Sequence, residues 1–178
     1  LGVVAADVSG VGTARVVPAA VEYGGDKALF GYGDAASGYV SVTNLVSNLG
    51  VVSADVTGVG TARASPAACR FGSDKAIFGY GVSSGGKVSL TNLVSNTGVV
   101  ASDVSGVGTA RNNLAAAEFG VGKGIFGYGD TGSVSSLTNL VSDLGVVASD
   151  VSGVGTARRQ LGAASYGGDK GVFAYGDS

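Results

Sequence analysis

Short apolar segments separated by glycine-rich turns follow one another along the whole chain. In Leu29–Tyr32 and Ile125–Tyr128 the aromatic residues fall on one side of an extended chain and a glycine on the other, the period-two pattern of a β-strand. The glycine leaves room for a neighbouring sheet. Glycine recurs every few residues, and inside a helix each costs about 1 kcal/mol relative to alanine. The pattern therefore predicts strands and no helices, and in the third repeat it places them at 114–119, 123–128, 134–141 and 145–151.

The same pattern of strands and turns occurs four times. The segment Asp7–Arg15 returns after 48, 48 and 47 residues, as Asp55–Arg63, Asp103–Arg111 and Asp150–Arg158. Glycine-rich turns such as Gly72–Lys75 read as hairpins, which makes each repeat an antiparallel meander. Repeats of this length are typical of propellers and solenoids. We expect one all-β domain over residues 1–178, a propeller of four-stranded antiparallel blades built from four 47–48-residue repeats: 1–48, 49–96, 97–143 and 144–178, the last incomplete.

The order of segments within a repeat resembles the kelch motif. In the third repeat Thr-Ala-Arg at 109–111 is followed by a small-residue strand, a Gly-x-Gly-Lys turn at 120–123, the strand Ile-Phe-Gly-Tyr-Gly at 125–129 and two outer strands. This resemblance implies a propeller with one blade per repeat. The near-identical copies are also similar to tandem repeats of environmental phage structural proteins, which implies a location on a virion or another extracellular assembly.

The expected closure of the ring leaves two arrangements open. If residues 2–8 form an outermost strand, the chain stops after the second strand of its last blade, near Tyr175, and the third strand of that blade is missing. A closed ring of four blades in one chain and a dimer forming a ring of eight are both compatible with this pattern. Repeats that met head to tail without closing would form a fibre. Self-association is therefore expected as one kind of partnership.

Composition narrows the chemistry. The chain has no histidine, methionine or tryptophan and one cysteine, Cys69. The commonest general base, the commonest zinc ligands and any disulfide framework are thus absent, and no Ser-His, Cys-His or paired-carboxylate set is evident. We expect a protein that is not an enzyme and that has no cofactor and no metal site.

Charge and hydropathy exclude further classes of partner. Eleven basic and thirteen acidic residues give a net charge of −2 with no basic stripe for a phosphate backbone, so no nucleic-acid partner is expected. No apolar run approaches the roughly 18–20 residues of a membrane span. Nothing at Leu1 resembles a signal peptide, and a start at leucine is expected to reflect processing or trimming.

Charged and amide residues recur at fixed places in the repeats. One carboxylate per turn is few for calcium, which takes about six to eight oxygens, so we expect each aspartate to cap its turn. Each arginine is expected to bond turn carbonyls or to pair with an aspartate of its own or the next repeat, although a ring of arginines that binds an anion is the alternative. Asn44, Asn92 and Asn139 are expected to satisfy backbone groups. The structural repeat positions are Asp7, Arg15, Asp55, Arg63, Asp103, Arg111, Asp150 and Arg158.

Two segments differ between the otherwise similar repeats: the one after the arginine and the one after Gly-Tyr-Gly. Because consecutive strands alternate in direction, both segments are expected on one face, which we call the variable face, and the turns on the other face are nearly uniform. Variable loops on a rigid scaffold often bind ligands, and drift after duplication also produces them. The candidate binding residues are Val16, Val17, Asp34, Tyr39, Ala64, Ser65, Ser83, Lys87, Asn112, Asn113, Asp130, Arg159 and Gln160.

These observations favour a non-enzymatic structural or adhesive module whose variable face recognises a surface receptor. The alternative is a carbohydrate-binding lectin with one site per blade. Such a site needs an aromatic platform beside polar groups, and Tyr39 is the only aromatic residue in the variable segments. A glycan or a surface receptor is the partner that we expect on this face.

Overall fold

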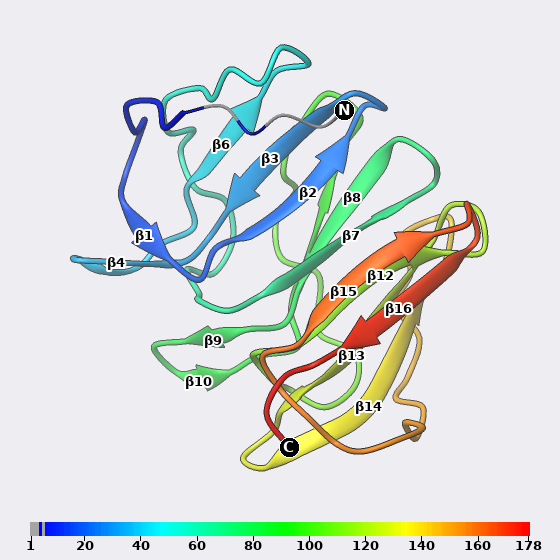
Figure 1. The fold of residues 1–178 in the computed structure, drawn as a ribbon. Helices are drawn as coiled ribbons and strands as arrows, with labels where there is room; N and C mark the ends of the chain where they lie inside the picture. Colours follow the sequence, from blue (N-terminus) through cyan, green and yellow to red (C-terminus); the bar gives the residue numbers. More distant parts are fainter. Residues whose placement is uncertain (1–3, 5) are drawn as a thin grey trace.

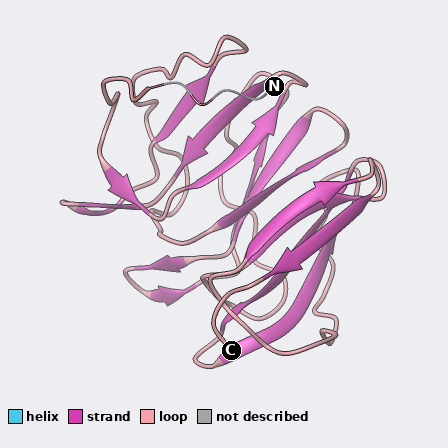
Figure 2. Cartoon of the chain, viewed as in Figure 1, coloured by secondary structure: helices cyan, strands magenta, loops and turns pink. Residues whose placement is uncertain are grey.

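Every element in the computed structural model, which describes residues 4 and 6–178, is a β-strand (Figures 1 and 2). The prediction of an all-β chain is confirmed, since the described residues contain no helix. The expected outer strand at 2–8 lies partly outside the described residues. The strands are β1 (Arg15–Val16), β2 (Ala19–Tyr23), β3 (Lys27–Gly31), β4 (Asp34–Ala35), β5 (Gly38–Tyr39), β6 (Thr43–Val46), β7 (Ala67–Phe71), β8 (Lys75–Gly79), β9 (Val82–Ser83), β10 (Gly86–Lys87), β11 (Thr91–Val94), β12 (Ala115–Phe119), β13 (Lys123–Asp130), β14 (Val134–Val141), β15 (Gly162–Tyr166) and β16 (Lys170–Ala174).

Each repeat contributes one main antiparallel sheet. The first three sheets are β2-β3-β6, β7-β8-β11 and β12-β13-β14, and the fourth is the hairpin β15-β16. Hairpins join the first two strands in every sheet, as the glycine-rich turns predict: Tyr23 pairs with Lys27, and Phe71 with Lys75. Two small sheets, β1-β4-β5 and β9-β10, are built from the variable segments of the first and second repeats.

The fourth strand of each repeat is less regular than the sequence suggests. The segment expected as a strand at 145–151 is held to β14 by two isolated bridges, Val147 to Val141 and Val151 to Thr138. Between these bridges Nδ2 of the Asn139 side chain donates a hydrogen bond to the Ala148 carbonyl oxygen at 3.0 Å. A side-chain hydrogen bond thus replaces part of the backbone ladder. The expectation of four regular strands is corrected to three strands and a bridged segment.

Successive sheets contact one another through their first strands. Strand β7 lies against β2 and β12, and β12 lies against β15, as Figure 1 shows. Within residues 4 and 6–178 no strand pairing joins the sheet of the first repeat to that of the last. The structure therefore shows several small antiparallel sheets, packed in the order of the chain.

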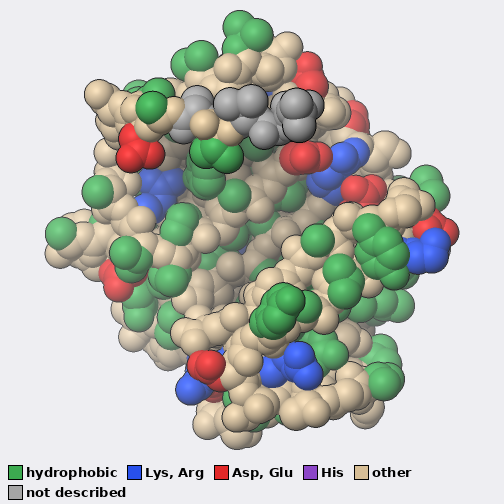
Figure 3. Space-filling model, viewed as in Figure 1, with side chains coloured by type: hydrophobic (Ala, Val, Ile, Leu, Met, Phe, Trp, Pro, Cys, Tyr) green, Lys and Arg blue, Asp and Glu red, His purple; other side chains and the backbone are tan. Residues whose placement is uncertain are grey.

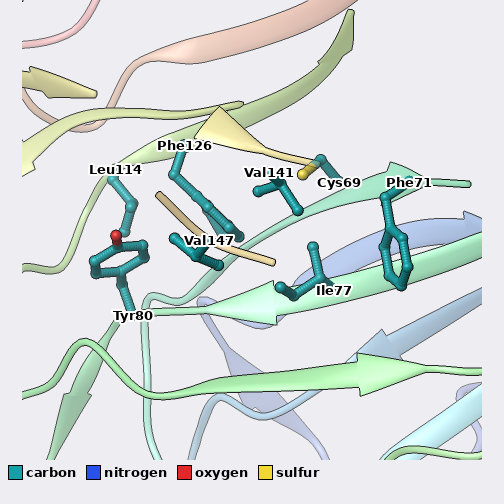
Figure 4. Close-up of a cluster of buried hydrophobic side chains, with 9 residues drawn as sticks. Cys69, Phe71, Ile77, Tyr80, Leu114, Phe126, Val141 and Val147 are labelled. Atoms are coloured by element: carbon teal, nitrogen blue, oxygen red, sulfur yellow. The ribbon is translucent and has the colours of Figure 1, made fainter. Parts of the chain in front are cut away.

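Neighbouring sheets pack through a phenylalanine ring of one sheet that lies against a glycine of the preceding sheet. Phe126 of β13 lies among Ile77, Tyr80 and Val141, with contributions from two successive repeats (Figure 4). A Cβ added to Gly79 would lie 2.7 Å from the Phe126 ring, which is closer than packed atoms approach. The small residue in the strand pattern thus admits the next sheet, as the alternation predicts.

Candidate functional site

A hydrogen-bonded set of four side chains braces each of the first three sheets, and we call it the repeat network. In the second repeat Arg63 Nη2 donates to Asn92 Oδ1 at 2.7 Å, and Asn92 Nδ2 donates to Asp103 Oδ1 at 2.9 Å. Asp103 also accepts from Thr61, from the backbone N–H at 3.0 Å and from Oγ1 at 2.7 Å. The same contacts connect Thr13, Arg15 and Asn44 of the first repeat with Asp55 of the second, and Thr109, Arg111 and Asn139 of the third repeat with Asp150 of the fourth, just as Asp103 of the third repeat joins residues of the second.

Burial and hydrogen bonding determine the protonation states of the arginine and the aspartate in this network. The Arg63 side chain is fully buried over the Tyr32 ring, with 3.9 Å between Cζ and the ring centre, and burial lowers the pKa of Arg63. Burial pushes the pKa of Asp103 up, but hydrogen bonds from Thr61 and Asn92 outweigh it, and the net pKa is lowered. Both groups are held in charged form by protein partners. Arg63 is therefore a structural residue with no exposed surface for an anion.

The turn aspartates offer little to a metal ion. The carboxylate oxygens of Asp55, Asp103 and Asp150 accept hydrogen bonds from a threonine and an asparagine of the preceding repeat. Among the residues that the structure describes, no group of three or more acidic, cysteine or histidine side chains is placed to hold a metal ion. Asp7 is exposed, ahead of the first sheet.

The two variable segments of each repeat lie side by side. Their backbones pair in every repeat: Val16 with Asp34, Ala64 with Val82, Asn112 with Asp130, and Arg159 with Asp177. Within the first repeat Asp34 also pairs with Tyr39, and in the second Val82 pairs with Lys87. The variable face is thus one continuous region in each repeat.

The variable segments of all four repeats also meet around a shared hollow of about 300 Å³. Backbone bonds connect neighbouring segments there, from Ser65 N to the Val17 carbonyl at 3.1 Å and from Gln160 N to the Asn113 carbonyl at 2.9 Å. All four residues have positive φ, between 46° and 54°. The hollow is lined by Val17, Pro18, Ser65, Pro66, Asn113, Leu114, Gln160 and Leu161.

Beside this hollow lies one charged cluster. Asp130 accepts from Lys87 Nζ at 2.5 Å and from Arg159 Nη1 at 2.6 Å, so it joins the second, third and fourth repeats. Hydrogen bonds from Lys87, Gly132 and Arg159 hold the pKa of Asp130 far below its usual value. The cluster fixes the relative positions of three variable segments.

The candidate residues separate into a supporting group and a surface group. Ala64, Ser83 and Asp130 are buried, so they support the variable face and do not form its surface. Val16 is 64% exposed, and Tyr39 and Gln160 are also exposed. A ligand on this face would meet an apolar rim and a few polar groups.

One feature that the sequence did not predict lies on the first strands of the four sheets. Arg70 Nη1 pairs with Glu22 at 3.1 Å, and its Nε lies 3.5 Å from a Glu118 oxygen, in a hollow of about 430 Å³ lined by the first strands of all four repeats. Figure 3 shows the middle of this side of the molecule hollowed. The same position of the four repeats is occupied by Glu22, Arg70, Glu118 and Ser165. A comparison of the repeats at this position would have shown that its charge varies.

Comparison with known proteins adds no relative. No protein-family model matches the sequence, and no curated protein matches it. Among the described residues no helix has the length and apolarity needed to cross a membrane.

Proposed function

We propose that this chain is a non-enzymatic structural or adhesive module, a kelch-like β-propeller that serves a virion or another extracellular assembly. Its variable face is the recognition surface. The observation that carries the proposal is the meeting of the variable segments of all four repeats around one hollow, on sheets of which the first three are braced by the repeat network. Recognition residues are commonly loops held by a rigid scaffold.

The proposed blade arrangement draws on the order of the sheets. Each repeat gives one antiparallel meander, and the first strands β2, β7, β12 and β15 all line one hollow. Innermost strands that surround a central axis are a feature of propellers. The arrangement brings four copies of the variable segments to the same end of that axis.

The absence of histidine from the sequence and the burial of its single cysteine support a non-enzymatic role. Burial raises the pKa of Cys69 to about 12, so at neutral pH the thiol stays protonated and is a poor nucleophile.

The experiment measures attachment of fluorescently labelled chain to fixed bacterial cells and to a glycan array. The test variant is Val16→Ser/Tyr39→Ala/Gln160→Ala, on the variable face. Its matched control is Val121→Ser/Tyr166→Ala/Asn48→Ala, which changes similar exposed side chains on or beside the uniform turns. Both variants should keep the far-ultraviolet circular dichroism of the parent chain.

Attachment to cells that is lost in the test variant and kept in the control supports the adhesive role. Binding of glycans on the array, at one site per repeat, would favour the lectin alternative over the adhesive role. Attachment that survives the test variant and disappears in the control contradicts a recognition role for the variable face.

A further inference from the structure

The contacts between successive sheets are of two kinds. Shared contacts use the same residue types at every junction between sheets. Repeat-specific contacts use charged or polar side chains that differ from one repeat to the next. The two kinds have different consequences for which repeats can lie next to one another.

The shared contacts are centred on a tyrosine. Tyr32 meets Phe78 with 5.2 Å between ring centres, and its hydroxyl donates to the Val59 carbonyl at 3.3 Å. The Gly33 amide donates to the Arg63 carbonyl at 2.9 Å. The corresponding residues make the same contacts at the other two junctions: Tyr80, Phe126, Val107, Gly81 and Arg111 at the second, and Tyr128, Phe173, Val154, Gly129 and Arg158 at the third. Because the residue types are the same, these contacts would also form between repeats that are not neighbours in the chain.

Near-identical repeats therefore carry a risk of wrong packing. Packing against a wrong neighbour, in the same chain or in another copy, is a characteristic failure of repeat proteins. A correct partner is distinguished from its competitors by a difference in free energy, which often needs an unfavourable contact with the competitor. The shared contacts supply no such difference between one repeat and another.

One position on the first strands does distinguish the repeats. The sequences of these strands are Ala-Ala-Val-Glu-Tyr, Ala-Ala-Cys-Arg-Phe, Ala-Ala-Ala-Glu-Phe and Gly-Ala-Ala-Ser-Tyr, and only the fourth position is charged in any of them. Arg70 Nη1 lies 3.1 Å from a Glu22 oxygen, and its Nε lies 3.5 Å from a Glu118 oxygen. Ser165 Oγ donates to the Glu118 carbonyl at 2.9 Å. Successive repeats thus touch through this position at all three junctions.

A second set of repeat-specific contacts lies on the variable face. Asp130 of the third repeat accepts from Lys87 of the second repeat and from Arg159 of the fourth. At the position of Arg159 the other repeats have uncharged residues: Val16, Ala64 and Asn112. Together with the pairs on the first strands, every junction includes at least one repeat-specific ion pair.

The charges on the first strands alternate in sign along the chain. Negative Glu22, positive Arg70 and negative Glu118 place opposite charges at the first and second junctions. Two copies of the second repeat side by side would bring arginine against arginine, and the first repeat beside the third would bring glutamate against glutamate. Like charges that face each other across an interface are unfavourable. The order of the chain gives attraction where these alternatives give repulsion.

We propose that the ion pairs of Arg70 and of Asp130 determine which repeats lie next to one another. The shared contacts hold two repeats together, and the charge contacts select the order of the chain over the packing of like repeats from two copies. Polar groups in coiled coils fix register in the same way and at a cost in stability. This role does not depend on what the variable face binds.

The ion pairs on the first strands are too exposed to be a major source of stability. The side chain of Glu22 is 68% exposed, and those of Arg70 and Glu118 are 26% and 24% exposed. Ion pairs of this kind contribute little to the free energy of unfolding. Selection depends on the difference between attraction in the correct order and repulsion in a wrong one, which is larger than either effect alone.

The experiment is refolding from urea at increasing protein concentration, with the products separated by gel filtration and their masses measured by light scattering. The neutral variant is Glu22→Gln/Arg70→Gln/Glu118→Gln. Its unfolding midpoint in urea should stay close to that of the parent chain. The share of protein outside the parent's main species should rise by about fivefold, because each like-charge contact that the parent avoids changes an equilibrium a few-fold.

An inverted variant separates the order of the charges from other effects. Glu22→Arg/Arg70→Glu/Glu118→Arg restores alternating charges, and it should return to the distribution of species that the parent gives. The inverted and neutral variants both lack the hydrogen bond from Arg70 to the Ser73 carbonyl, so this bond cannot cause a difference between them.

The matched control is Asp26→Asn/Lys27→Gln/Asp169→Asn. Like the neutral variant, it removes two carboxylates and one cation, but it takes them from ion pairs within single turns. It should refold like the parent.

A neutral variant that refolds to the parent's distribution of species overturns the proposal. So does an inverted variant that spreads over as many species as the neutral one, since the contact would then depend on the particular side chains and not on the order of their charges. Circular dichroism shows whether each variant is folded, and if the neutral variant is not, the inverted variant alone decides.

Discussion

The Thr-Ala-Arg segment is identical in the second and fourth repeats, yet its arginine has different surroundings in each. Arg63 is fully buried, with the amide of Asn92 at 2.7 Å and the carboxylate of Asp103 at 4.0 Å. Arg158 reaches only the carbonyls of Thr156 and Tyr175, at 3.2 and 3.3 Å. Its Cζ lies 5.9 Å from the Tyr128 ring centre, against 3.9 Å for Arg63 and Tyr32.

The difference shows which part of the repeat is local and which is not. The turn and the direction of the arginine are local, because both arginines contact the threonine carbonyl two residues earlier. The desolvated charge network depends on an asparagine 29 residues and an aspartate 40 residues after Arg63. Among the described residues Arg158 contacts only backbone carbonyls. The contribution of a repeat position to stability therefore depends on the contacts that its own repeat makes.

The largest expected effect comes from removing the buried arginine. Arg63→Ala leaves Asn92 and Asp103 without their cation and opens a cavity over Tyr32, and it should lower the free energy of unfolding by about 3–5 kcal/mol. The matched change Arg158→Ala should cost less than about 1 kcal/mol, because it removes only exposed hydrogen bonds. Urea denaturation monitored by circular dichroism measures both. Equal losses would show that the network adds nothing in the second repeat.

The carboxylate of the network gives a pH-dependent version of the same test. Asp103→Asn should cost about 1.5–3 kcal/mol at pH 7, the range for hydrogen bonds to a charged group. The pKa of Asp103 in the folded protein is lowered, so its contribution is complete above the ordinary value near 3.8 and is lost as pH falls through the lowered value. The difference between parent and variant should stay constant from neutral pH down to about pH 5 and shrink below about pH 4.

The control for this prediction is Asp169→Asn. That carboxylate is about half-exposed and pairs with the neighbouring Lys170 at 2.6 Å, so its removal should cost under about 1 kcal/mol. A parent-to-Asp103→Asn difference that does not change between pH 7 and pH 3 would contradict the role given to the carboxylate.

Two glycine substitutions, one at a contact between sheets and one away from such contacts, should differ in stability by less than the variants above. Gly79→Ala places a methyl group 2.7 Å from the Phe126 ring and should lower the free energy of unfolding by about 1–3 kcal/mol. Gly162→Ala, on the first strand of the last sheet, meets no atom within 4 Å and should be neutral or slightly stabilising. Thermal unfolding ranks the two variants against the parent. The reverse ranking would contradict the account of the glycine.

Much of this fold could be predicted from local pattern. The alternation in Ile125–Tyr128 and the glycine-rich turns are properties of neighbouring residues, and the structure has the strands and hairpins they predict. The bridged segment at 145–151 could not be predicted, because its irregularity comes from Asn139, which replaces ladder bonds from a different strand.

The pairing of the variable segments with each other could be predicted, whereas their contacts between repeats could not. Comparison of the repeats identified the variable segments, and strand direction brought them to one face. The burial of Ala64 and Ser83 depends on neighbours in three dimensions, as does the joining of Lys87 and Arg159 by Asp130. These contacts connect different repeats, and no pattern within one repeat encodes them.

The smallest expected effect concerns backbone strain on the variable face. Val17 and Asn113 occupy the same place in the first and third repeats, with φ of 46° and 54°. A β-branched residue in this region is strained, whereas asparagine adopts it readily. Val17→Asn should therefore raise the free energy of unfolding by about 0.5–1 kcal/mol, and Asn113→Val should lower it by a similar amount. Thermal unfolding of both variants measures the pair. A gain for Val17→Asn would mean that the first repeat carries valine at a cost in stability, which is what a position that serves a contact on this face should show. Equal stability of all three proteins would instead mean that the loop relaxes, and that its valine reflects drift.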